Sequence, residues 1–184
     1  MRDLGLLMLR LAFGGLLSAH GAQKLFGSFE GHGLEGTGKF FEKIGFQPGK
    51  QWAFMAGFGE FGGGLLTALG FLHPVGPITT VAPMAVAWGR VHWGKPIFAT
   101  QGGAELPATN IAIAVALALV GPGKLSIDGM FGIRPHPAVA ALVSAGVAAG
   151  TLMALSQPTP EPVAQPPEQP QTEQSPQREP VATS

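Results

Sequence analysis

The chain has 184 residues, 46% of them apolar and only 12% charged, well below the roughly 25% charged residues of an average soluble domain. This composition argues against an ordinary soluble fold, and the formal net charge of zero, without a basic stripe, means that nucleic acid is not an expected partner. The absence of cysteine excludes disulfides, thiolate metal sites, iron–sulfur ligation and dithiol redox chemistry by this chain itself.

Five apolar stretches follow one another along the chain, at about residues 4–22, 52–72, 74–93, 106–121 and 137–155. A helix needs about 20 residues to cross the ~30 Å hydrocarbon core, so the first, second and fifth stretches are long enough and the fourth is short. Pro83 is expected to kink the third. The pattern predicts an all-α transmembrane bundle of five spans. A cleaved signal peptide is the alternative for the first stretch, although Arg10 interrupts its apolar run.

The last segment, residues 157–184, differs from the rest in composition. It carries eight prolines, four acidic residues and one arginine, and it has almost no side chains to bury. Such a segment cannot offset the entropy of ordering, so we expect a disordered tail.

Small residues at helical spacing mark packing surfaces within the spans. Lipid tails are as apolar as leucine, so membrane helices associate where small side chains let their backbones approach closely. The fifth stretch carries Gly146 and Gly150 at such a spacing. The stripe in the first stretch is Arg10, Gly14, Leu17, Gly21 and Lys24, and that in the second is Ala53, Ala56, Gly57, Glu60, Gly63, Gly64 and Thr67.

Two charged residues, Arg10 and Glu60, lie within predicted spans. A charge there costs at least ~2.5–3.5 kcal/mol and therefore usually faces the bundle. A rise of ~1.5 Å per residue leaves the two about 9 Å apart in depth. His20 and Lys24 lie on the Glu60 side of the membrane and are the alternative partners for its carboxylate.

Following the spans back and forth defines two sides, side A with the N-terminus and side B opposite. Polar side chains that converge at one mouth of a bundle are typical of a ligand site with proton-handling groups. The alternative is an ordinary headgroup rim with Trp52, Trp88 and Trp93 as an aromatic belt. The five histidines form no close helical pair, so no metal is expected. Above Glu60, side B gathers His20, Gln23, Lys24, Arg90, His92, Lys95 and Glu105.

Several short motifs occur in order over about residues 4–130: Leu9-Arg10-Leu11, Ala19-His20-Gly21-Ala22-Gln23-Lys24-Leu25-Phe26-Gly27, Gly57 with Glu60 and Gly63-Gly64, His92-Trp93, Gly102-Gly103-Ala104-Glu105-Leu106-Pro107, and Gly121-Pro122-Gly123-Lys124-Leu125-Ser126-Ile127-Asp128. Their order and spacing resemble the DoxX family of small bacterial membrane proteins. The resemblance implies a four-helix membrane domain over residues 1–130 in the bacterial inner membrane. The sequence itself predicts the additional span at 131–156 and the tail that follow. The additional span, the tail and Leu125, where the family often has an aromatic residue, depart from the family pattern.

The DoxX family is linked to a subunit of thiosulfate:quinone oxidoreductase and to membrane complexes that handle thiol or oxidative stress. The resemblance therefore implies a quinone-proximal redox role, with quinone as cofactor. Membrane lipid, a redox partner protein and a second copy of the chain are the implied partners. The implied catalytic residues are Glu60 and His20, the implied cofactor-binding residues are Gln23, Lys24, His92 and Glu105, and the structural or site-supporting residues are Arg10, Ser126 and Asp128.

Three hypotheses follow. In the first, a quinone head group is hydrogen-bonded at side B and Glu60 exchanges the proton that quinone reduction requires, while electrons come from a partner. In the second, the bundle is a non-catalytic scaffold whose tail recruits soluble partners. In the third and least favoured, Arg10 and Glu60 line a path for a solute or proton. The alternative for Ser126 and Asp128 is a capped helix end, and Arg10 has a purely structural alternative.

The orientation of the bundle has two competing indications. Six loop Lys and Arg residues lie on side B and three on side A, so the positive-inside rule makes side B cytoplasmic. The cytoplasmic N-terminus usual in the resembled family makes side A cytoplasmic.

Overall fold

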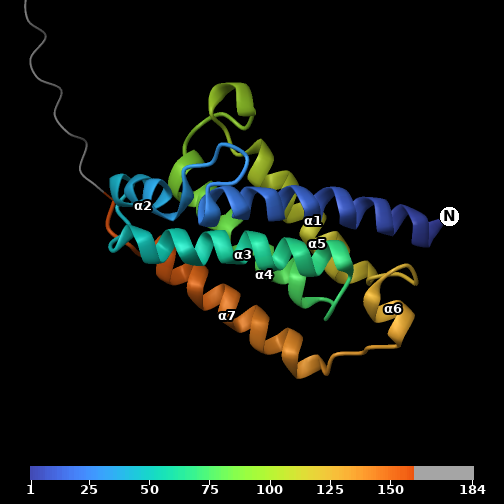
Figure 1. Cartoon of the computed structure of the whole chain (residues 1–184). Helices are drawn as coiled ribbons and strands as arrows, with labels where there is room; N and C mark the ends of the chain where they lie inside the picture. Colours follow the sequence, from blue (N-terminus) through green and yellow to red (C-terminus); the bar gives the residue numbers. More distant parts are fainter. Residues whose placement is uncertain (160–184) are drawn as a thin grey trace, which may run out of the picture.

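The computed structural model describes residues 1–159, and every regular element in that range is helical. The predicted all-α class is confirmed for this part of the chain. The predicted disordered tail lies outside the described residues from residue 160 onward. The elements of Figure 1 are α1 (Arg2–Phe26), α2 (Gly33–Lys43), α3 (Gly49–Leu69), α4 (Val75–Ala87), the π-helical turn η1 (Trp88–His92), the 3-10 turn η2 (Ala99–Gln101), α5 (Glu105–Val120), α6 (Ile127–Phe131) and α7 (Pro137–Leu155).

The five predicted apolar stretches coincide with α1, α3, α4 continued by η1, α5, and α7. Among the described helices, two, α1 and α7, are long and apolar enough to cross a membrane by length and composition. α5 is a shorter apolar helix of 16 residues, and α4 has 13 residues before η1. α3 has 21 residues, but six glycines and Glu60 lower its hydropathy. The described helices thus supply two candidate spans where the sequence predicted five.

α1 and α3 lie side by side in antiparallel directions over most of their length (Figure 1). Glycines on the two predicted stripes make this approach possible. A Cβ added at Gly64 would stand 2.6 Å from the carbonyl oxygen of Gly14, and one added at Gly21 would stand 2.6 Å from that of Gly57. Because no other residue fits at such distances, the two backbones pack directly on each other, as small-residue interfaces in membranes do.

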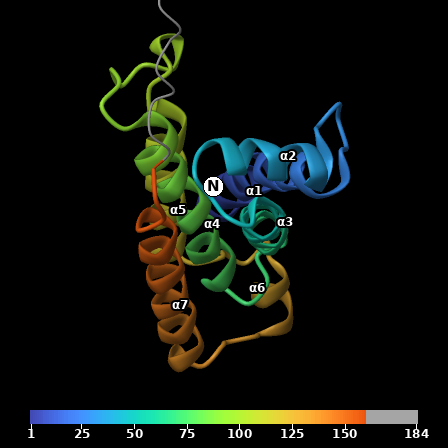
Figure 2. The same cartoon turned by 90° about the vertical axis from the view of Figure 1, so that its left-hand side faces the viewer.

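α4 lies at the centre of the bundle and packs on α3, α5 and α7. The apolar core joins α1, α4 and α5 through Phe13, Leu17, Met84 and Leu117. α7 packs along α4 on the side of the molecule away from α1 and α2 (Figure 2). Within residues 1–159, α7 has no comparable packing against α3, and the two helices diverge from the end where α2 lies (Figure 1).

Candidate functional site

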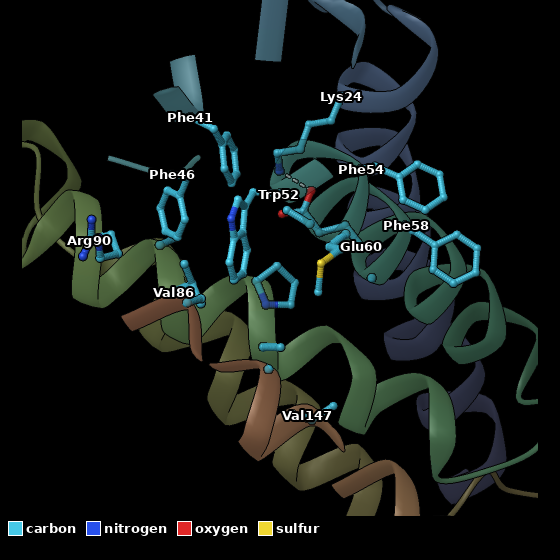
Figure 3. A pocket seen from close by; sticks show the side chains of 18 of the residues that line it. Lys24, Phe41, Phe46, Trp52, Phe54, Phe58, Glu60, Val86, Arg90 and Val147 are labelled. Carbon is cyan, nitrogen blue, oxygen red and sulfur yellow. Dashed lines mark hydrogen bonds and ion pairs between the residues drawn. The ribbon is translucent and has the colours of Figure 1, made fainter. Parts of the chain in front are cut away.

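A cavity of about 500 Å³ lies between α3, α4 and α7, and α2 and the segment joining α2 to α3 close one end of it (Figure 3). Its walls are aliphatic and aromatic. Among the described residues, the charged side chains that line it are Lys24, Glu60 and Arg90. A large apolar cavity with a few convergent polar groups is the usual form of a small-molecule site, so this cavity is the candidate site.

Lys24, in the last turn of α1, donates a hydrogen bond to Oε2 of Glu60 on α3 and forms an ion pair with it (Figure 3). The Glu60 side chain is 3% exposed and that of Lys24 28% exposed. At ~1.5 Å per residue, Glu60 lies about 16 Å from the start of α3, well inside the bundle. Gly57, one turn earlier, lets α1 come close, since an added Cβ there would lie 3.2 Å from Cβ of Lys24. Of the alternative partners for the buried carboxylate, the structure pairs Lys24 with it.

Three aromatic rings form the wall between this ion pair and the α2 end of the cavity. The ring of Phe46 is fully buried and lies 5.3 Å from that of Phe41 and 5.2 Å from that of Trp52, measured between centroids. Figure 3 shows Trp52 between Phe46 and Glu60. The tilted rings present flat faces and edges to the cavity, a surface suited to a planar ring.

Arg90, at the end of the cavity beside Phe46, joins three segments of the chain. Its guanidinium carbon lies 4.9 Å from the Phe46 ring centroid. It donates hydrogen bonds to the carbonyls of Ile44 (2.9 Å), Gln157 (2.6 Å) and Pro158 (2.9 Å). Ile44 caps the C-terminal end of α2, and the other two follow α7. A cation is favourable at helix C-termini, where carbonyls lack intrahelical partners, so Arg90 holds the ends of α2 and α7 together.

α4 contributes a further polar atom near Glu60. Pro83 has no N–H, so the carbonyl of Thr79 lacks its usual helical donor. Both residues line the cavity, and a Cβ added at Gly59 of α3 would lie 3.8 Å from the Thr79 carbonyl oxygen. The cavity wall beside Glu60 therefore carries a hydrogen-bond acceptor from α4.

The remaining residues predicted to bind or catalyse at side B do not line this cavity. His20 is exposed on α1. Gln23 donates to the carbonyl of Phe29 at 3.3 Å, in the loop after α1. His92 Nδ1 lies 2.7 Å from the carbonyl of Gly102, and Glu105 accepts from the Ala99 N–H at 2.9 Å, so these two side chains organise the segment between η1 and α5. The single mouth predicted from the sequence is thus divided between one cavity and two loops.

Arg10, Ser126 and Asp128 lie together at the opposite end, on side A. Arg10 is 2% exposed and donates to the carbonyls of Ala68 and Leu125. Ser126 caps α6 by accepting from Gly129 N–H at 2.9 Å. The structure gives these two residues contacts to backbone groups, in keeping with the structural alternative.

Asp128 receives two backbone donors from the turn between α3 and α4. Its Oδ1 accepts from Leu72 N–H at 3.0 Å and its Oδ2 from His73 N–H at 2.7 Å. Its own N–H donates to the carbonyl of Gly70 at 3.1 Å. The predicted cap at this position therefore serves a turn more than fifty residues earlier in the chain.

Phe46 is a site residue that the sequence did not single out, and the roles of Trp52 and Arg90 in the site differ from those expected. Trp52 had been interpreted as part of an aromatic belt, and Arg90 as one of several cations at side B. The signals that point to them are the amphipathic segment 33–43, whose apolar face needs a cover, and a cation placed directly after a proline-containing apolar helix. Within residues 1–159 no group of three His, Asp or Glu side chains is placed to hold a metal ion.

Comparison with known proteins agrees with the resemblance found in the sequence. The DoxX family model matches residues 5–93, from α1 through η1, which includes Lys24, Glu60 and Arg90. No curated protein and no solved structure matches the chain. The cavity walls from α1 to η1 lie inside the matched region and the wall from α7 lies outside it. The chain therefore carries a DoxX-family membrane domain over residues 5–93.

Proposed function

We propose that this protein is a quinone-proximal subunit of a membrane oxidoreductase or oxidative-stress complex, and that its cavity holds a quinone ring beside the Lys24–Glu60 ion pair. In this proposal α1, α3, α4 with η1, α5 and α7 cross the bacterial inner membrane as five spans. The observation that carries the proposal is a buried carboxylate, paired with a lysine, in the wall of an otherwise apolar and aromatic cavity.

The donor set and the shape of the cavity fit a quinone. The ring is planar and apolar, and Phe41, Phe46 and Trp52 offer rings to stack against it. Its oxygens accept hydrogen bonds when oxidised and donate them when reduced. Lys24 supplies a donor, and Glu60 and the Thr79 carbonyl supply acceptors in the same part of the wall.

A bound quinone would supply the capacity to accept two electrons and two protons. Glu60 then takes up a proton from the side-B surface and passes it on within the apolar wall, once for each of the two protons. Lys24 holds the carboxylate in place and, being partly exposed, connects it to the surface at side B. Electrons come from a redox partner protein, because the chain has no cysteine and no metal-binding group among its described residues.

The test is lipid extraction and mass spectrometry of the protein purified in mild detergent. The chain offers a matched control, because Glu35 and Lys50 form a second Lys–Glu ion pair, which is exposed and does not line the cavity. The hydrogen bond from Lys50 lowers the pKa of Glu35, so the control pair carries an ionised carboxylate at neutral pH. Glu60→Gln and Glu35→Gln therefore remove one carboxylate each, inside and outside the cavity.

We expect bound quinone in the wild type and in Glu35→Gln, and loss of quinone in a folded Glu60→Gln protein. Equal quinone content in Glu60→Gln and wild type would contradict the role of the carboxylate. A folded wild-type protein that carries no quinone, even after addition of quinone, would overturn the proposal. The scaffold function would then be tested by deleting residues 160–184 and asking whether soluble partners are still recovered.

A further inference from the structure

One wall of the cavity comes from α7, which lies outside the DoxX match. α7 is one of the two described helices that are long and apolar enough to cross a membrane, and only 6% of its most apolar stretch is buried inside the described structure. It packs along α4, and Arg90 holds its C-terminal end. In the proposed five-span arrangement the exposed side of this helix is covered by hydrocarbon, so the space between α7 and α3 borders on lipid.

The side of α7 that faces the cavity is built from glycine, alanine and valine. Positions 143, 146, 147, 150 and 154 line the cavity and fall on one helical stripe. A Cβ added at Gly146 or Gly150 would meet nothing within 4 Å. These two glycines are therefore not required for a close helix contact, unlike Gly14 and Gly64 in the α1–α3 interface. They leave open space in the cavity.

The cavity continues from its polar end to the outer surface of α3. Phe54, Met55 and Phe58 line it and are each at least 50% exposed. Phe54 and Phe58 stack at 5.9 Å between ring centroids. The cavity thus has a buried polar end at Glu60 and an apolar end that opens between α3 and α7. A space of about 500 Å³, apolar and open at one end, has the size and lining of a small-molecule site.

We infer that the ligand is a lipid-soluble quinone with a long hydrocarbon chain, whose ring reaches the Lys24–Glu60 pair while its chain passes between α3 and α7 into the bilayer. This inference rests on the proposed quinone function. Gly146 and Gly150 of α7 determine which ligands fit, because they leave open the passage for the hydrocarbon chain of the quinone. α7 is thereby a specificity element added to the DoxX domain.

The hydrocarbon chain of the ligand gains little free energy by moving from lipid to the cavity wall, since lipid is equally apolar. The effect of narrowing the passage is therefore steric. A Cβ at position 146 or 150 would meet nothing within 4 Å, so a leucine there has room to enter the open space of the cavity. It would exclude a chain-bearing ligand and leave room for a ring alone. In an apolar pocket even one methylene changes recognition by about 10-fold or more.

The experiment measures ligand binding to the whole polypeptide in nanodiscs. The two probes are decylubiquinone and the same benzoquinone ring without its hydrocarbon chain. The variants are Gly146→Leu and Gly150→Leu, with Ala145→Leu as control, because Ala145 is exposed on the opposite side of α7 and lines no cavity. We expect the two glycine variants to bind decylubiquinone about tenfold or more weakly, with the chain-free ring and the control unchanged. Thermal unfolding checks that all variants fold.

Two kinds of failure are distinguishable. If wild-type protein binds both probes and the glycine variants bind decylubiquinone as well as wild type, or lose both probes alike, the passage along α7 is wrong while the quinone site stands. If wild-type protein binds neither probe, the proposed function fails and the passage fails with it.

Discussion

Lys24 on α1 and Glu60 on α3, 36 positions apart in sequence, form an ion pair in the wall of the cavity. The pair contributes to two properties at once. It links the two helices that pack most closely, and it supplies an acid and a base to a space that is otherwise apolar. The two contributions can be separated by substitutions at each partner.

Lys24→Met leaves the Glu60 carboxylate buried without its partner. Breaking a fully buried pair costs about 3–5 kcal/mol, and the partial exposure of Lys24 reduces the expected destabilisation to roughly 2–3 kcal/mol. The double variant Lys24→Met with Glu60→Met removes both charges and should recover most of that loss. Denaturant unfolding in detergent measures both. A double variant no more stable than Lys24→Met would show that the charges are not the cause.

The glycine interface between α1 and α3 gives a prediction with a control one residue away. A Cβ at Gly14 would lie 2.6 Å from the backbone nitrogen of Ala68, whereas one at Gly15 would meet nothing within 4 Å. Gly14→Ala should therefore destabilise the bundle by about 1–3 kcal/mol through overpacking. Gly15→Ala should be neutral or stabilise by about 0.5–1 kcal/mol, because alanine favours helix. Similar unfolding midpoints for the two variants would contradict the close approach.

The packing surfaces of α1 and α3 could be predicted from the sequence because they depend on helical spacing alone. Gly14, Gly21, Gly57 and Gly64 recur on one face of each helix, and no knowledge of the loops is needed to place them. The expected depth of Glu60, and its place toward the end of the bundle where Lys24 lies, followed from the same counting. This is why Lys24 was among the candidate partners before the structure selected it.

The composition of the site could not be predicted in the same way. His20 immediately precedes the buried Gly21, so a rotation of about 100° along the helix turns it to the outside. His92 and Glu105 flank the segment between η1 and α5, and their positions depend on how that segment folds back. Arg90 meets the ends of α2 and α7 only through long-range contacts, 46 and 67 positions away in sequence. Periodicity within one helix contains no information about such contacts.

Arg90→Met should loosen the end of α7. The variant loses the hydrogen bonds to Ile44, Gln157 and Pro158 and the contact with Phe46. We expect a loss of about 2 kcal/mol in stability, because hydrogen bonds from a charged donor are stronger than neutral ones. Spin labels at positions 47 and 155 should report a broader distance distribution in the variant. Arg134→Met, at an exposed residue between α6 and α7, is the control and should leave the distribution unchanged.

Substitutions at Asp128 test whether the side-A residues support the quinone site or only the fold. Asp128→Ala leaves the N–H groups of Leu72 and His73 without their acceptors, so we expect a loss of about 2–3 kcal/mol. Asp128→Asn retains one carbonyl acceptor and should lose about half as much. Because Asp128 lies at the end of the bundle away from the cavity, both variants, once folded at low temperature, should retain the quinone content of the wild type. Loss of quinone from a folded Asp128→Asn protein would show that the position of the turn between α3 and α4 affects quinone binding at Glu60.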